Sequence, residues 1–175
     1  MSQPEARSKP WWQIIAVGRN PVVTAVRLVI LSILAVVGFN LSVAHIQVRG
    51  ISMAPTYTDG QKIWLNRISL WRRPPERGEV VGIGSTADKV LLLKRIIALP
   101  GEKVAIRRGV VFIDGQAIEE PYLKNPAPWN WPTNAPVYAL ESDEYLVIGD
   151  NRSMHQDLHE WGAVRRDRIV GRVTR

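Results

Sequence analysis

The amino-acid sequence predicts a mostly β protein, in which an antiparallel β-sheet domain follows one N-terminal transmembrane helix. One long apolar stretch lies near the N-terminus, and from Val48 onward the apolar runs are short and bounded by Gly, Pro, Asp and Asn. Short runs of this kind are typical of strands, and no amphipathic segment of helix length follows residue 50. At 175 residues, the chain has room for one domain with its own core.

The apolar stretch covers residues 28–46 and is preceded by a second apolar segment at 22–26. A helix over 28–46 would be about 29 Å long, close to the roughly 30 Å of a hydrocarbon core. Four basic residues precede the stretch, with Glu5 as the single acid there: Arg7, Lys9, Arg19 and Arg27. The comparable segment after the stretch contains only two basic residues, Arg49 and Lys62. This asymmetry places the N-terminus in the cytoplasm. We expect a cytoplasmic segment at 1–21, a single-pass transmembrane anchor at 22–46 and an extracytoplasmic β-rich domain at 47–175.

Two other interpretations of the apolar stretch remain open. A buried core helix has a similar composition, and Ser42-Val43-Ala44 has the small-x-small pattern of a signal-peptide cleavage site.

Composition limits the chemistry. The absence of cysteine excludes disulfides, thiolate zinc sites and cysteine nucleophiles, so a nucleophile has to be Ser, Thr or Lys. The formal charge of +7 suits anionic lipid as well as nucleic acid, but the basic residues are scattered and not interleaved with aromatic ones. We expect a lipid membrane as a partner, no nucleic acid, and neither a cofactor nor a metal.

Strands are expected over six short runs, at 62–65, 80–83, 90–99, 104–106, 145–148 and 169–173. The clearest hairpin joins 110–113 to 116–118 through Asp114-Gly115, because this pair tolerates the positive φ angles of a two-residue turn. The proline-rich stretch at 121–136 is expected to be a surface loop. Its Trp129 and Trp131 either fold onto the domain or lie at a membrane interface.

Lys94 and Ser52 are the candidate catalytic residues. On a strand, Lys94 would share a face with Leu92, Ile96 and Ala98. Apolar surroundings disfavour the charged ammonium form of lysine, and a lysine that acts as a general base has to be neutral. The alternative is a strand-edge lysine with its head in water. Ser52 lies in an irregular segment that can expose its hydroxyl and its backbone N–H, although a serine near proline is more often a turn residue.

Four motifs, found in a fixed order along the chain, favour the catalytic interpretation of Ser52 and Lys94. They are Ser-Met-Ala-Pro-Thr at 52–56 with Asp59-Gly60 after it, Arg-Gly-Glu-Val-Val at 77–81, Lys-Arg-Ile-Ile-Ala-Leu-Pro-Gly-Glu at 94–102, and Gly-Asp-Asn-Arg at 149–152. Behind an N-terminal anchor, this order resembles the type I signal peptidases over nearly the whole chain.

The resemblance implies a membrane-anchored serine endopeptidase that removes signal peptides from exported preproteins and cuts after small-x-small sites. Ser52 would be the nucleophile and Lys94 the general base, with an acyl-enzyme intermediate. Met53 would contact substrate. The supporting positions that it implies are Gly50, Pro55, Arg95, Asp150, Ser153, His155 and Asp157.

The sequence departs from the family pattern at two places. Gly50 stands where some members have a serine that assists the oxyanion hole. His155 stands where the family has the serine that orients the lysine. Three interpretations stay open: His155 orients the lysine, Ser153 orients it, or His155 is only a surface residue. Asp157 matches the family aspartate and is expected to pair with Arg95, while His159 replaces a family arginine.

Three other classes of protein share parts of this pattern. A maturase dedicated to one substrate, such as a conjugative pilin, and an inactive membrane-anchored peptide-binding module both stay open. A self-cleaving repressor needs a DNA-binding helical module that the first fifty residues do not supply.

Overall fold

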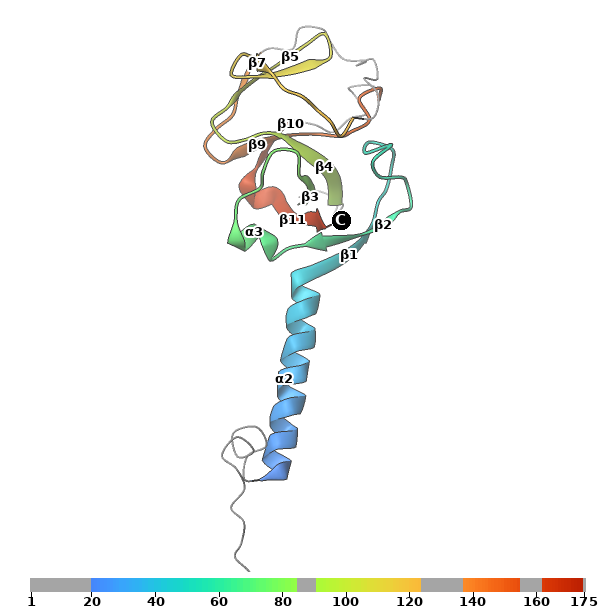
Figure 1. Cartoon of the computed structure of the whole chain (residues 1–175), viewed down its shortest axis with the longest axis vertical. Helices are drawn as coiled ribbons and strands as arrows, with labels where there is room; N and C mark the ends of the chain where they lie inside the picture. The colour runs from blue at the N-terminus through green and yellow to red at the C-terminus, as the bar shows by residue number, and fades with distance from the viewer. Residues whose placement is uncertain (1–19, 85–90, 124–136, 155–161, 175) are drawn as a thin grey trace, which may run out of the picture. The chain divides into compact units, whose positions relative to one another are not determined.

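The computed structural model describes residues 20–84, 91–123, 137–154 and 162–174. Contacts divide the chain into two compact units, Met1–Leu41 and Ser42–Arg175. In the second unit every described strand pair is antiparallel, and the strands form two sheets. The predicted fold class, mostly antiparallel β with one N-terminal apolar helix, is therefore confirmed (Figure 1).

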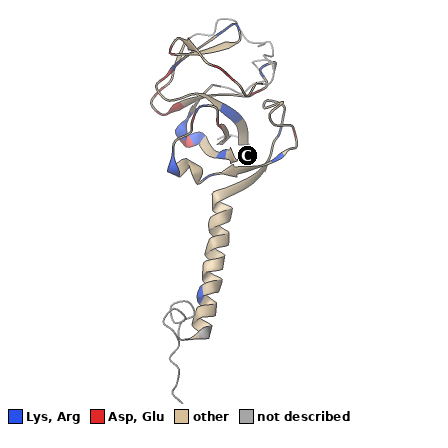
Figure 2. Cartoon of the chain, viewed as in Figure 1, with Lys and Arg blue, Asp and Glu red and all other residues tan. Residues whose placement is uncertain are grey.

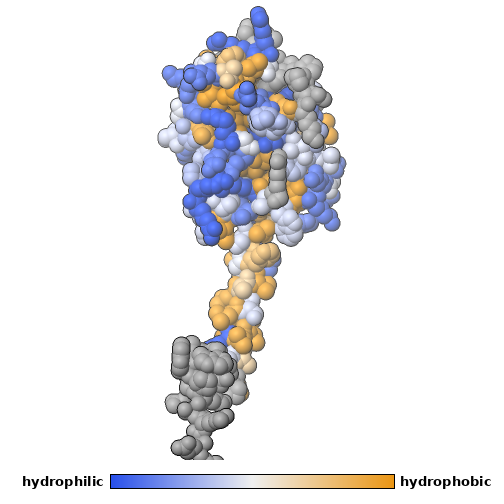
Figure 3. Space-filling model, in the orientation of Figure 1, coloured by the Kyte–Doolittle hydropathy of each residue, from blue (hydrophilic) through white to orange (hydrophobic). Residues whose placement is uncertain are grey.

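The N-terminal helix α2 covers Pro21–Ser42. Asn20 caps its first turn, because the Asn20 side-chain oxygen accepts a hydrogen bond from the backbone N–H of Val22 at 3.0 Å. From Val22 to Ser42 the helix is long and apolar enough to cross a membrane, and none of it is buried inside the structure. Its apolar side chains are exposed along its length (Figure 3). That exposure argues against a core helix, because a core helix buries its apolar face.

The helix ends four residues before the end of the expected anchor at 46. Residues 43–46 instead belong to strand β1 (Val43–Gln47), which pairs with β2 (Lys62–Asn66) in a register that places His45 opposite Trp64. The two rings stack with centroids 4.9 Å apart. By composition, residues 43–46 continue the apolar span. They form a strand because β-branched and aromatic residues are stabilised by packing against the neighbouring strand, and the sequence does not show which segment that neighbour is.

The larger sheet has seven strands in the order β1-β2-β11-β3-β4-β9-β10. The strands not yet given are β3 (Val80–Gly84), β4 (Leu91–Ala98), β9 (Glu144–Ile148), β10 (Gly162–Arg165) and β11 (Ile169–Thr174). A short helix α3 (Ser69–Arg72) follows β2, and a 3₁₀ helix η2 (Arg166–Arg168) precedes β11. The last strand therefore lies between two early strands and ties the C-terminal part of the chain to the core.

The smaller sheet has the order β7-β6-β5-β8, with β5 (Lys103–Arg107), β6 (Val110–Ile113), β7 (Gln116–Ala117) and β8 (Tyr138–Ala139). The predicted hairpin is confirmed as β6 and β7. Asp114 and Gly115 have φ angles of 50° and 83°, as a two-residue turn of this kind requires.

A register shift in β4 corrects one expectation about Lys94. Between Ile96 and Ala98 the pairing of β4 with β9 is irregular. After this bulge, Ala98 packs together with Ile97 in the core cluster that includes the smaller sheet, while Ile96 belongs to a different cluster. Ala98 therefore does not continue the face of Leu92 and Ile96, because a bulge inserts one extra residue and reverses the alternation.

Gly171 in β11 offers a test of how tightly this sheet is packed. An added Cβ there would meet the Cγ and Cδ2 atoms of Leu65 at 2.6 and 2.9 Å. We expect Gly171→Ala to lower the free energy of unfolding by about 1–3 kcal/mol, as overpacking a well-filled core does. A urea titration of the detergent-solubilised chain measures this.

Gly84→Ala is the matched control, because its added Cβ would come no closer than 3.3 Å to Val170. If Gly171→Ala unfolds at the same urea concentration as Gly84→Ala, the packing around Leu65 is looser than described.

Candidate active site

Ser52 lies in the loop that joins β1 to β2, and glycine and hydrogen bonds shape this loop. Gly50 has a φ of 84°, a left-handed conformation that side chains rarely adopt. Its backbone N–H donates to the Asp59 carboxylate at 2.7 Å, which closes the loop across its base. Ser52 itself is half-buried. The backbone conformation at position 50 therefore favours glycine over any residue with a side chain.

The far side of the loop is bonded to the segment that follows β9. The backbone N–H of Asn151 donates to the carbonyl of Ser52 at 3.0 Å, and the Asn151 side chain donates to the carbonyl of Ile51 at 3.1 Å. The Thr56 hydroxyl donates to the Asp150 carboxylate. Three contacts therefore hold residues 51–56 against Asp150 and Asn151.

Lys94 lies in the middle of β4, opposite Val81 of β3, and only 3% of it is exposed. The strand alternation places Leu92 and Ile96 on the same side of β4 as Lys94. This position agrees with the prediction that Lys94 lies among apolar residues. It does not agree with the alternative of a strand-edge lysine whose ammonium group is in water.

The register of β4 and β9 brings the two candidate residues into the same region. Arg95 lies opposite Ile148, and the two strands are antiparallel. The chain that continues from Ile148 therefore runs beside the half of β4 that contains Lys94, and Ser52 is bonded to this continuation at Asn151. Residues that are 42 positions apart in sequence thus flank one segment, 149–151.

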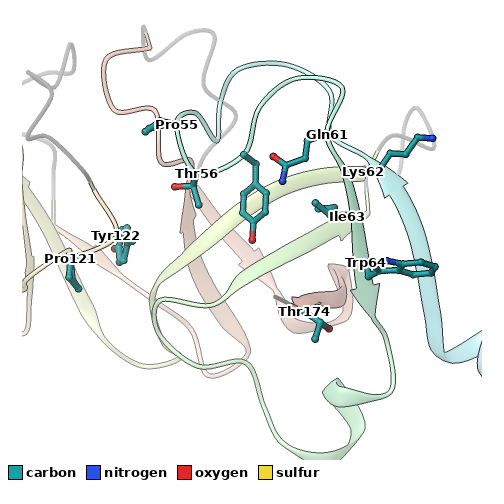
Figure 4. A pocket seen from close by; sticks show the side chains of 10 residues that line it. Pro55, Thr56, Gln61, Lys62, Ile63, Trp64, Pro121, Tyr122 and Thr174 are labelled. Carbon is teal, nitrogen blue, oxygen red and sulfur yellow. The ribbon is translucent and has the colours of Figure 1, made fainter.

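Two cavities include residues of this region in their walls. One of about 910 Å³ includes Lys94 in its wall, together with apolar side chains from β3, β4, β9 and β10: Ile83, Leu92, Val147, Ala163 and Val164. Another, of about 570 Å³, is lined by Pro55 and Thr56 of the Ser52 loop, and Figure 4 shows Tyr122 on one side of it and Ile63 and Trp64 on the opposite side. Among the four cavities described, none is lined by both Ser52 and Lys94.

Arg95 and Asp150 form a buried ion pair beneath the Ser52 loop. The Nε and Nη2 atoms of Arg95 donate to the two carboxylate oxygens of Asp150 at 2.8 and 2.5 Å. The side chains are 4% and 0% exposed. Arg95 also donates to the carbonyl of Gly78 and lies over the ring of Tyr122, 4.0 Å from its centroid. Asp150 therefore links the strand that carries Lys94 to the loop that carries Ser52.

The predicted pairing of Arg95 with Asp157 stays a prediction, and Arg95 pairs with Asp150 in the described part of the chain. Asp150 is near because it follows Ile148, the residue opposite Arg95, by two positions. Asp157 and His155 lie outside the described residues, as do Trp129 and Trp131. The hydroxyl of Ser153 donates to Asn151 at 2.7 Å. An orienting role for Ser153 or His155 stays a prediction.

Met53 and Pro55 occupy different environments. Pro55 is exposed and lines the 570 Å³ cavity. Met53 is 1% exposed and packs in a core cluster with Val48, Tyr57 and Leu93. Its contact with substrate stays a prediction that requires part of this cluster to open.

A second buried network lies beside Arg95, and no pattern in the sequence indicates it. Arg152 is 1% exposed, and its guanidinium forms an ion pair with Glu120, which also accepts a hydrogen bond from the Tyr122 hydroxyl at 2.6 Å. Burial, and after it the neighbouring Glu120 carboxylate, raises the pKa of the Tyr122 phenol. Arg152 belongs to a recognisable motif, whereas Glu120 and Tyr122 stand at the start of a proline-rich stretch without periodicity.

The raised pKa of Tyr122 predicts a loss of stability in alkali. An unfolded tyrosine ionises near pH 10. The folded protein holds this proton more tightly, so the stabilisation is complete below about pH 10 and is lost as the pH rises above it. We expect the urea midpoint of the wild type to fall more steeply than that of Tyr122→Phe between about pH 9 and 11. Parallel curves for the two proteins would contradict this assignment.

Within the described part of the chain, no group of three or more His, Asp or Glu residues could hold a metal ion.

Comparison with known proteins gives a consistent result. The family model described as "Signal peptidase, peptidase S26" matches residues 22–175. The chain is 32% identical over 164 residues to signal peptidase I of Leptolyngbya laminosa, which covers 88% of the chain and 78% of that relative. It is 38% identical to the probable signal peptidase I-2 of Synechocystis sp., over 70% of the chain and 57% of that relative.

It is also 34% identical to signal peptidase I of Bacillus amyloliquefaciens, over 71% of the chain and 68% of that relative. Among solved structures, a signal peptidase I from Enterococcus faecalis aligns with a TM-score of 0.45 at 25% identity, over 58% of this chain and 98% of that one.

Proposed function

Since the chain belongs to the signal peptidase family, peptidase S26, we propose that it removes signal peptides from exported preproteins with Ser52 as nucleophile and Lys94 as general base. One observation carries the assignment of the pair: Ser52 is bonded to Asn151, in the segment that runs beside the strand of Lys94. The burial of Lys94 supports it, because burial disfavours the ammonium form and a neutral amine can accept a proton.

The proposed reaction has two steps. In the first, the amine of Lys94 takes the hydroxyl proton of Ser52 as the serine oxygen attacks the scissile carbonyl, and the same proton passes to the leaving amine of the mature protein. In the second, water attacks the acyl-enzyme, Lys94 accepts its proton and returns it to Ser52, and the signal peptide leaves as a free acid. The backbone N–H of Ser52 binds the developing oxyanion.

Small side chains at the first and third positions before the cut are the proposed specificity. Membership of the signal peptidase family supports it, and this specificity requires pockets whose walls exclude side chains larger than alanine.

Anchoring by α2 is the other part of the proposal, with the N-terminus in the cytoplasm and the β domain on the extracytoplasmic side. The length and apolar surface of α2 support it, as does the excess of basic residues before the helix. Ser52 follows the end of α2 by only ten residues, which keeps the nucleophile within reach of substrates held in the same bilayer.

Cleavage of several unrelated preproteins by the full chain in detergent tests this function. We expect a single cut after an Ala-x-Ala site, located by N-terminal sequencing of the mature product. Leucine in place of the alanine at the first or third position should block it. A preprotein bound but left intact in every case would favour an inactive peptide-binding module, and cleavage of only one would favour a dedicated maturase.

A further inference from the structure

Asn151 binds the main chain on both sides of Ser52. Its side-chain amide donates to the carbonyl of Ile51 at 3.1 Å, and its backbone N–H donates to the carbonyl of Ser52 at 3.0 Å. These carbonyls belong to the two peptide units that flank the α-carbon of Ser52. One residue, 100 positions from Ile51 in the sequence, therefore orients both units.

The carbonyl of Ile51 has a second donor. The backbone N–H of Ala54 also donates to it, at 3.0 Å, so both lone pairs of this oxygen are engaged. A carbonyl that accepts two hydrogen bonds polarises its peptide unit, and the N–H of that unit becomes a stronger donor. In the unit that joins Ile51 to Ser52, this N–H belongs to Ser52.

The contact with Asn151 also determines where the N–H of Ser52 points. The peptide bond between Ile51 and Ser52 is trans, and in a trans peptide the C=O and N–H bonds point in opposite directions. Because the C=O of Ile51 faces Asn151, the N–H of Ser52 faces away from it. No described residue accepts a hydrogen bond from this N–H, and Gly50 adds no side-chain donor near it. The N–H of Ser52 is therefore free to bind a substrate oxygen.

Ser153 sets which way the amide of Asn151 faces. The hydroxyl of Ser153 donates to the side-chain oxygen of Asn151 at 2.7 Å. The amide nitrogen is thereby turned toward Ile51, whereas a flipped amide would place its oxygen against the carbonyl of Ile51.

Buried ion pairs hold the residues on both sides of Asn151. Asp150 pairs with Arg95 of β4, and Arg152 pairs with Glu120. The basic band on β4 in Figure 2 includes Arg95. Both arginines are buried, and a buried ion that loses its partner is strongly destabilised. The two pairs therefore keep Asn151 at a fixed position beneath the Ser52 loop.

We propose that Asn151 is a positioning residue for the oxyanion site, and that Ser153 acts through it. The proposal rests on the proposed function, in which the N–H of Ser52 binds the oxygen that becomes negative as the serine attacks. By holding the carbonyl of Ile51, Asn151 holds this N–H in place before the substrate arrives, so that the donor need not reorient in the transition state.

Asn151→Ala and Asn151→Asp test the role of the amide in the full chain in detergent. Alanine removes the donor without adding charge, and aspartate keeps the shape of the side chain but cannot donate when ionised. We expect kcat for preprotein cleavage to fall about 10- to 100-fold in both variants, with KM unchanged. The effect is smaller than the roughly hundredfold to thousandfold loss caused by removing an oxyanion donor itself.

Asn66→Asp is the matched control. The side-chain oxygen of Asn66 accepts the backbone N–H of Ser69, and a carboxylate oxygen accepts it equally well. Cleavage by this variant should equal that of the wild type.

A double-mutant cycle tests the route from Ser153. Ser153→Ala is expected to lower kcat less than Asn151→Ala does, and the two changes together should be no worse than Asn151→Ala alone. Losses that multiply would show that Ser153 acts on another group, and this would overturn its assignment to Asn151.

Urea unfolding of each variant separates positioning from folding. A lower kcat with an unchanged urea midpoint and an unchanged KM is the expected result. The proposal is overturned if Asn151→Ala retains the wild-type kcat, if KM rises while kcat is constant, or if the loss of rate only follows the unfolded fraction. Failure of the wild type to cleave any preprotein overturns the proposed function, and the positioning role with it.

Discussion

Replacement of Ser52 with alanine is expected to lower kcat for preprotein cleavage by at least about a thousandfold, as loss of a nucleophile does in other serine peptidases. Binding of the preprotein should persist, because the change removes one oxygen from a half-buried side chain. Initial rates in detergent and a pull-down with labelled preprotein measure the two properties. Ser69→Ala is the control, since the hydroxyl of Ser69 only donates to the carbonyl of Asn66 in the turn before α3.

Lys94→Met should be as inactive as Ser52→Ala, and the double variant should be no worse than either. Residues that act as one catalytic unit show this lack of additivity. Lys94→Arg distinguishes a role of Lys94 as general base from a role as a positive charge. The guanidinium of arginine stays protonated and cannot accept the serine proton, so a loss of activity supports the role as base. Substantial activity in Lys94→Arg would remove Lys94 from the role of general base, while activity in Ser52→Ala would remove Ser52 from that of nucleophile.

The second large effect is expected on stability, at the buried pair of Arg95 and Asp150. Asp150→Ala leaves the guanidinium of Arg95 buried without its carboxylate, and such a break costs about 3–5 kcal/mol. The hydroxyl of Thr56 also loses its acceptor, so the Ser52 loop loosens and activity falls with stability. Urea unfolding in detergent and the cleavage rate of the folded fraction measure these effects.

Two further variants make this prediction specific. Arg95→Met combined with Asp150→Leu removes both charges and should be more stable than Asp150→Ala, because no unpaired ion stays buried. Asp143→Ala breaks an exposed ion pair with Arg165 and should cost about 1 kcal/mol or less. An Asp150→Ala effect as small as that of Asp143→Ala would show that the pair is accessible to water.

The fold was predictable wherever the sequence alternates clearly or carries a specific turn. Asp114-Gly115 identified its hairpin, and the apolar run around Lys94 identified β4. β1 was not found, since its residues continue the apolar composition of the helix and are distinguished only by pairing with β2. β10 was missed because only alternate residues of Gly162–Arg165 are half-buried, and two of its four residues are small.

The sequence indicated candidate residues of the site but not the connections between them. Short motifs pointed to Ser52, Lys94, Arg95 and Asp150, yet no single motif indicates that Asp150 binds both Arg95 and Thr56 of the Ser52 loop. That arrangement depends on the register of β4 and β9, which is set by packing between segments some fifty residues apart, and a bulge in β4 shifts it further.

The pairing of β1 with β2 has a consequence for autoproteolysis. Ser42-Val43-Ala44 has the same small-x-small pattern that this enzyme is proposed to cut, and it follows an apolar helix as a signal peptide would present it. In the folded chain, the Ser42 carbonyl is bonded to Arg67, and Val43 and Ala44 lie in register with Asn66 and Leu65. A peptidase binds its substrate as an extended strand through these same backbone groups. If the proposed function holds, we therefore expect that one copy of the enzyme cannot cut another between α2 and the β domain unless β1 first separates from the sheet.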